Sequence, residues 1–213
     1  MKSINNKVIG YKGIEVPYTV MLTEDYTKKL AIFLPGAGYT TKSPLFHFAE
    51  EIFLNANYNV LRVNYQYTDK AYDDFTMTEL NKAIVHDVRQ VISEALKGRN
   101  YQDFYLVGKS LGTIAMGSEM LRPEFSDAKA VWVTPLLNQE QVLNTMVNSK
   151  NEALCYIGDK DRYYSAGAFE LLKENPNLKS TLLPEINHRL DCQNDPLKSI
   201  DALKQIIAGI KEF

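Results

Sequence analysis

The sequence predicts an α/β protein in which a mostly parallel central sheet is covered by helices on both faces. Short apolar runs alternate with segments whose apolar residues recur at helical spacing along most of the chain. Most of these runs are apolar throughout, which is typical of parallel strands buried on both faces. The 213 residues contain no repeat, low-complexity tract or linker, so we expect a single domain spanning residues 1–213.

The strands are predicted from apolar runs bounded by turn residues. Residues 8–22 favour two strands joined as a hairpin near Lys12-Gly13, and the run at 29–34 ends at Pro35-Gly36. The remaining predicted strands lie at 59–63, 104–107, 130–133, 153–157 and 178–183. The two first strands precede the alternating pattern, so we expect seven or eight strands in all.

Capping residues mark the helix starts. Ser43-Pro44 is typical of an N-cap followed by proline at the first helical position, and Asp195-Pro196 repeats the pattern. Thr76 and Glu79 form a capping box, and Gly98 ends that helix. Other helices are predicted at 110–121, 139–147 and 166–173. Helical spacing predicts these buried residues: Leu45, Phe48, Ala49, Ile52 and Phe53; Leu80, Ile84, Val88, Val91, Ile92 and Ala95; Leu197, Ile200, Leu203, Ile207 and Ile210.

Composition excludes several classes of protein. Lys and Arg number 24 against 26 Asp and Glu, which gives a net charge of −2 and no reason to expect a nucleic-acid partner. No apolar run approaches the ~20 residues of a membrane-spanning helix, and no signal peptide is visible. Two cysteines, Cys155 and Cys192, cannot build a disulfide framework or a four-ligand zinc site. We therefore expect reduced thiols, a cytoplasmic location and no metal.

Residues 108–112 read Gly-Lys-Ser-Leu-Gly, a G-x-S-x-G pattern between a predicted strand and a predicted helix. A serine on such a sharp turn projects its hydroxyl beyond the sheet, and glycines two residues away remove collisions. In parallel sheets the active site lies beyond the carboxyl ends of the strands. The pattern therefore predicts that Ser110 is a nucleophile.

A serine nucleophile needs a base, and the chain has three histidines. His47 and His86 lie within predicted helices, whereas His188 follows the last predicted strand at the expected edge of the sheet. The third group must orient the imidazole. Asp159 and Asp161 both follow the strand at 153–157, and we prefer Asp161 as the acid, with Asp159 as the alternative.

The negative oxygen of a tetrahedral intermediate needs preorganised donors. One is the backbone N–H of Leu111, directly after the serine, and the second is expected from the loop Pro35-Gly36-Ala37-Gly38. We assign the second donor to Ala37, with Gly38 next. No Gly-Lys-Ser/Thr follows at P-loop spacing, so this loop is not predicted to bind phosphate.

Together these motifs resemble the α/β-hydrolase superfamily over residues 29–213. The motifs are Leu34-Pro-Gly-Ala-Gly38, the serine turn, Gly158-Asp-Lys-Asp161 and Asn187-His188, in the superfamily's order. The resemblance implies a hydrolase fold similar to small carboxylesterases, thioesterases and dienelactone-hydrolase-like enzymes, with no cofactor. Pro35 departs from the histidine of many members. A serine nucleophile also separates the chain from members that use cysteine or aspartate.

Only residues 134–138 join the predicted strand at 130–133 to the next helix, where many members insert a cap, so we expect no cap domain. The expected walls of the site are Gly38, Tyr39, Tyr65, Tyr67, Tyr72, Leu136 and Tyr163. Lys109, Lys160, Arg162 and Arg189 flank it. The sequence predicts a serine hydrolase of small esters or thioesters. An acyltransferase and a non-catalytic binding protein are the alternatives, and the oligomeric state is not predicted.

Overall fold

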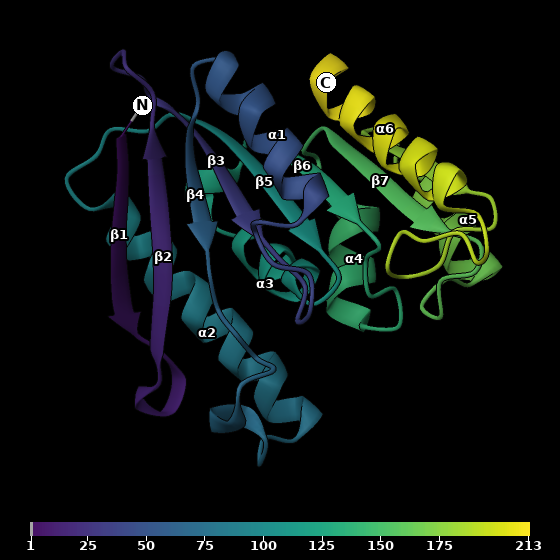
Figure 1. The fold of residues 1–213 in the computed structure, drawn as a ribbon, viewed down its shortest axis with the longest axis horizontal. Coiled ribbons are helices and arrows are strands. Elements are labelled where there is room, and N and C mark those ends of the chain that lie inside the picture. The colour runs from purple at the N-terminus through teal and green to yellow at the C-terminus, as the bar shows by residue number, and fades with distance from the viewer. Residues whose placement is uncertain (1) are drawn as a thin grey trace.

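One eight-stranded sheet organises residues 2–213, the part of the chain that the computed structural model describes (Figure 1). Its strands are β1 (Lys2–Ile9), β2 (Glu15–Leu22), β3 (Lys29–Leu34), β4 (Asn59–Val63), β5 (Asp103–Lys109), β6 (Lys129–Val133), β7 (Ala153–Gly158) and β8 (Leu178–Leu183). The spatial order is β1-β2-β4-β3-β5-β6-β7-β8. β1 and β2 are antiparallel to their neighbours, and the other pairs are parallel, as predicted.

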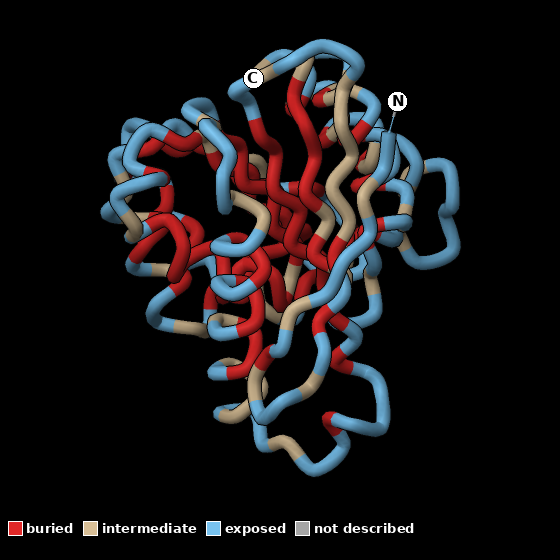
Figure 2. Tube along the Cα trace, turned by 90° about the vertical axis from the view of Figure 1, so that its left-hand side faces the viewer, coloured by how far each residue is buried: buried red, intermediate tan, exposed pale blue. Residues whose placement is uncertain are grey.

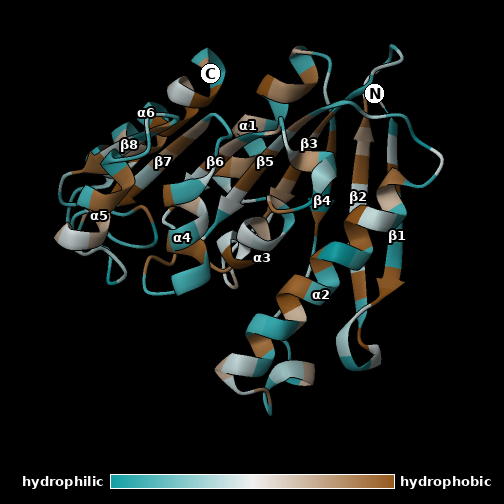
Figure 3. Ribbon diagram, turned by 180° about the vertical axis from the view of Figure 1, so that it is seen from behind, coloured by the Kyte–Doolittle hydropathy of each residue, from teal (hydrophilic) through white to brown (hydrophobic). Residues whose placement is uncertain are grey.

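Helices cover both faces of the sheet (Figures 1 and 3). α1 (Pro44–Asn55) and α6 (Pro196–Glu212) pack on one face, around a core that includes Phe33, Phe46 and Ile206. The other face carries α2 (Met77–Leu96), α3 (Gly112–Glu119), α4 (Glu140–Asn148) and α5 (Ala166–Lys173). Every residue of α3 is buried, because α2 and α4 both pack against it. Figure 2 shows the buried strands running through the centre of the molecule.

Two predicted caps form, and one does not. The Thr76 side chain accepts from the Glu79 N–H while Glu79 accepts from the Thr76 N–H, which completes the capping box of α2. Asp195 caps α6 by accepting from the Lys198 N–H at 2.9 Å. Ser43 precedes α1, but its side chain makes no capping hydrogen bond.

Three predicted core residues are exposed instead. Phe48 of α1 is 45% exposed, because that helix packs through Phe46, which lies two residues earlier and about half a turn around the helix. Leu197 and Ile200 are 71% and 59% exposed, and α6 is buried through Ala202, Ile206 and Ile210. Its first turns therefore present apolar side chains to solvent beside the cavity described below.

The connections fix where a site can lie. β1 begins at Lys2, earlier than the predicted residue 8, because its polar first half is largely exposed and carries no apolar signal. Between β6 and α4 there are only residues 134–139, so no cap covers the carboxyl ends of the strands. Within residues 2–213, no helix is both long and apolar enough to span a bilayer.

Candidate active site

Ser110 stands at a sharp turn between β5 and α3. Its φ is 51°, in the left-handed region that non-glycine residues rarely adopt. A Cβ on Gly112 would lie 2.0 Å from the carbonyl oxygen of Leu34, and one on Gly108 would lie 2.8 Å from the sulfur of Met116. Close packing against the Leu34 backbone therefore requires glycine at position 112, whereas a side chain at position 108 would require the Met116 side chain to move.

Ser110 lies in a hydrogen-bonded chain with His188 and Asp161. The Ser110 Oγ is 2.7 Å from His188 Nε2, and His188 Nδ1 is 2.8 Å from Asp161 Oδ2. The carboxylate accepts from Nδ1–H, which leaves Nε2 free to accept the serine proton. The Asp161 side chain is fully buried, whereas that of His188 is 16% exposed and reaches the cavity.

Loop hydrogen bonds hold the acid and the base. The second carboxylate oxygen of Asp161 accepts from the Tyr163 N–H at 2.9 Å, which fixes the carboxylate plane. Asn187, before the histidine, accepts at Oδ1 from the Arg189 and Asp191 N–H groups. Asp159 instead accepts from the Glu185 N–H at 2.7 Å and caps the loop that carries His188. The two aspartates thus have different contacts, and Asp161 faces the imidazole.

Two backbone N–H groups near Ser110, those of Ala37 and Leu111, have no acceptor among residues 2–213. The loop is close to the nucleophile, since a Cβ on Gly36 would lie 3.2 Å from the Ser110 Cβ. A Gly36 N–H bond to the Tyr39 carbonyl and a Tyr65 hydroxyl bond to the Pro35 carbonyl hold the loop in place.

An open cavity of about 570 Å³ adjoins Ser110 and His188. Its apolar lining comes from Pro44, Leu190, Ile200 and Leu203, and Gly36, Ala37, Gly38 and Tyr39 line it from the loop after β3. Arg162, Arg189 and Asp191 contribute charge at the rim. This lining suits a ligand that combines an apolar chain with a polar group near Ser110.

Not all of the predicted walls lie at the cavity. Gly38 and Tyr39 line it, and the Tyr163 ring meets His188 edge-on with ring centroids 4.8 Å apart. Tyr65 is buried beneath the loop that carries Ala37, because its hydroxyl donates to the Pro35 carbonyl. Leu136 is buried in the core below α3. Tyr67 and Tyr72 also belong to that core, where Tyr67 donates to the buried Asp87.

Sequence reasoning placed Lys109 among the flanking charges and missed its burial. Its side chain is only 2% exposed, and its Nζ donates to the His188 carbonyl at 3.0 Å and to Thr134 Oγ1 at 3.3 Å. Burial lowers the pKa of Lys109 to about 8, against the opposing charges of Asp161 and Asp191. Its position gave a signal, because Lys109 ends β5, a central strand that is buried at every residue after Asp103.

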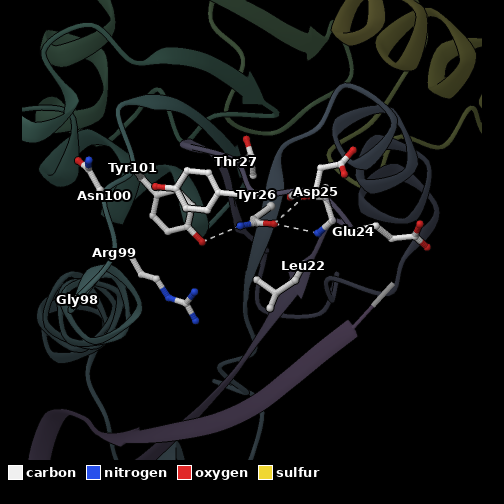
Figure 4. Close-up of a pocket in the computed structure, with 11 residues that line it drawn as sticks. Leu22, Glu24, Asp25, Tyr26, Thr27, Gly98, Arg99, Asn100 and Tyr101 are labelled. Carbon is white, nitrogen blue, oxygen red and sulfur yellow. Dashed lines mark hydrogen bonds between the residues drawn. The ribbon is translucent and has the colours of Figure 1, made fainter.

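The two histidines that the sequence analysis set aside lie away from the cavity. His47 and His86 are exposed on α1 and α2. Within residues 2–213, no cluster of three metal-ligating side chains is present. A second hollow, of about 320 Å³, lies at the amino ends of β3 and β5, beside Tyr26 and Tyr101 (Figure 4). It contains neither serine nor histidine, so its lining offers no nucleophile–base pair.

Solved structures similar to this chain share its fold. One is a putative α/β hydrolase of unknown function from Agrobacterium tumefaciens (17% identity, TM-score 0.74, covering 98% of this chain and 94% of that one). Another is a serine hydrolase without a lid from Xanthomonas campestris (16%, 0.70, 99% and 94%). A third is an esterase from Pyrococcus furiosus (13%, 0.72, 100% and 93%).

Among proteins with curated descriptions, none matches the chain. The model of the alpha/beta hydrolase domain family matches residues 27–213, which is most of the sequence. The match spans β3 to α6 and includes the serine turn, both aspartates and His188. The chain therefore belongs to the alpha/beta hydrolase domain family.

Proposed function

We propose that this protein is a serine hydrolase that cleaves a carboxylic ester or thioester through an acyl-enzyme on Ser110. The observation that carries the proposal is the continuous hydrogen-bonded chain from Ser110 Oγ through His188 to Asp161. A serine hydroxyl becomes an effective nucleophile only beside a base that accepts its proton. The esterases among the similar structures support the reaction class through their fold.

The reaction follows from these positions. Ser110 Oγ attacks the carbonyl carbon while its proton moves to His188 Nε2, and Asp161 stabilises the imidazolium through Nδ1. The Ala37 and Leu111 N–H groups, which have no acceptor within residues 2–213, would donate to the oxyanion. His188 then protonates the leaving alcohol or thiol. Water attacks the acyl-enzyme with the same histidine as base and releases the acid and Ser110.

The apolar side of the cavity supports an acyl chain of intermediate length as the preferred group. Ile200 and Leu203 of α6 line that side, and no cap limits entry.

We also propose a cytoplasmic location, which the two free thiols Cys155 and Cys192 support.

The test uses a fluorophosphonate probe and a panel of p-nitrophenyl esters and acyl thioesters of graded chain length. We expect labelling of the wild type at Ser110, and a loss of kcat of roughly 10⁴–10⁶-fold in Ser110→Ala and His188→Ala, with the double variant little worse. Ser126→Ala, which removes an exposed serine outside the site, is the matched control. Retention of most activity by Ser110→Ala, or labelling at another serine, would contradict the proposal.

A further inference from the structure

The Lys109 ammonium joins three segments that each carry part of the site. Its Nζ donates to the backbone carbonyl of His188, in the loop after β8, and to Thr134 Oγ1, directly after β6. On its third side it lies 4.6 Å from the centroid of the Tyr39 ring, in the loop after β3. Lys109 itself precedes Ser110, so one side chain connects the nucleophile's turn to the base and to the loop of Ala37.

This ammonium is buried without a carboxylate partner. Within residues 2–213, Lys109 forms no ion pair, and its contacts are a carbonyl, a hydroxyl and an aromatic face. A buried charge of this kind costs free energy that an apolar side chain of similar size would not. Fold stability alone therefore does not account for a lysine at this position.

We propose that Lys109 is a positioning residue whose charged ammonium holds the His188 loop and the Tyr39 ring in the geometry required for proton transfer from Ser110. The inference rests on the function proposed above. A carbonyl oxygen accepts a stronger hydrogen bond from a charged ammonium than from a neutral amine. Loss of the charge on Lys109 therefore weakens its hydrogen bond to the His188 carbonyl. Small displacements of reacting groups reduce rates steeply, because the proton must transfer across a short hydrogen bond.

The charge of Lys109 changes in an accessible pH range. Burial lowers its pKa to about 8, while Asp161 and Asp191 act in the opposite sense. His188 faces it with its backbone carbonyl, and the side chains of Arg162 and Arg189 line the same cavity. The Tyr39 ring also contacts it, and burial raises the pKa of Tyr39, so this ring remains neutral over the same range. The ammonium is present below about pH 8 and is lost as the pH rises, so the reaction of Ser110 should slow in alkali.

The experiment measures the maximal phosphonylation rate and the probe affinity between pH 6 and 10 with a fluorophosphonate, which needs no natural substrate. In the wild type we expect the rate to fall about 5- to 10-fold above pH 8 while probe affinity changes little. Lys109→Met should be roughly 10-fold slower at pH 7.5 and flat above it, with a melting temperature no lower than that of the wild type. Lys179→Met, which removes an exposed lysine on β8, should behave as the wild type.

A second variant covers the case in which Lys109→Met does not fold. Thr134→Val keeps the side-chain shape but removes one acceptor of the ammonium, so the alkaline fall should move to lower pH. A wild-type rate that stays constant to pH 10, or an unchanged alkaline fall in Lys109→Met or Thr134→Val, would overturn the inference. Absence of Ser110 labelling at every pH in the wild type would instead overturn the proposed hydrolase function, so the two failures are distinct.

Discussion

The backbone of Ser110 is strained in the conformation that exposes its hydroxyl. A φ of 51° costs free energy for a residue with a Cβ, and the close packing at Gly108 and Gly112 holds the turn in place. The motif could be recognised in the sequence because this geometry demands small residues at fixed spacing. The geometry of the turn does not determine whether a long side chain next to the serine is buried or exposed, and for that reason the burial of Lys109 was missed.

The choice between two neighbouring aspartates can be tested directly. Asp161→Asn should lower kcat by roughly 10³–10⁴-fold, because an amide cannot hold the required imidazole tautomer. Asp159→Asn keeps an oxygen that can accept from the Glu185 N–H, so kcat should change less than about 3-fold. The measurement is ester turnover by the two purified variants at pH 7.5. A larger loss in Asp159→Asn would assign the acid to Asp159.

Residue types predicted which polar side chains come together, Ser110, His188 and Asp161, better than they predicted the cavity wall. Serine, histidine and aspartate after strands are few in this chain, whereas tyrosines are numerous, with 13 in the sequence. Tyr65 follows β4 at the expected edge, but its hydroxyl finds the Pro35 carbonyl beneath the loop. Whether a ring faces inward or toward a cavity depends on long-range packing that local sequence does not contain.

At the scale of elements, the capping box of α2 provides a test of local stability. Thr76→Ala removes the acceptor of the Glu79 N–H and should lower the free energy of unfolding by about 1 kcal/mol. Thr78→Ala, at an exposed position within the same helix, should change it by no more than about 0.5 kcal/mol. Urea denaturation monitored by circular dichroism measures both variants. Equal effects would show that the cap contributes nothing specific.

Most strand and helix positions follow from apolar periodicity, and the failures at α6 and at β1 have two different causes. The apolar periodicity of α6 predicts that one face of the helix is buried along its whole length. Its first turns instead extend beside the cavity and expose Leu197 and Ile200. Local pattern indicates that a face is apolar but not whether protein or ligand covers it. The polar start of β1 was missed for the opposite reason, since pairing with β2 alone makes it a strand.

At the scale of the whole molecule, buried tyrosines determine the response to alkali. Burial raises the pKa of Tyr65, Tyr67 and Tyr72, the last to about 12, and Asp87 adds to the rise for Tyr67 and Tyr72. Each folded-state pKa lies above 10.0, the usual value for tyrosine. Their stabilisation is therefore complete below about pH 10 and is lost as the pH rises through the folded values. Lys109 acts in the opposite sense between about pH 8 and 10.5, because its folded pKa is lowered.

We therefore expect the free energy of unfolding to fall steeply only above about pH 10. Urea denaturation at pH 8, 9, 10 and 11 measures it, and absorbance near 295 nm reports tyrosine ionisation in the same samples. Tyr26→Phe is the matched control, because that ring is 79% exposed. If the folded protein ionises all its tyrosines near pH 10 without losing stability, the buried cluster does not have the predicted effect.

The fold class could be predicted from alternation alone, whereas the spatial order of the strands could not. Nothing local in the sequence dictates that β3 pairs with both β4 and β5. The motifs require only that the carboxyl ends of β3, β5, β7 and β8 lie along the same edge of the sheet, which leaves the order of the strands open.

The hairpin that begins the chain has a consequence for self-association. β1 ends the sheet on one side, so one row of its backbone N–H and C=O groups has no strand beside it. Such a row is a template onto which a second copy could add a strand and start aggregation. Lys2 is exposed along β1, and the Lys7 ammonium pairs with Glu15 of β2, so a strand added from a second copy would pack against charged rather than apolar side chains. The same polar residues that give the first half of β1 no apolar pattern therefore disfavour the pairing of a second copy with this edge of the sheet.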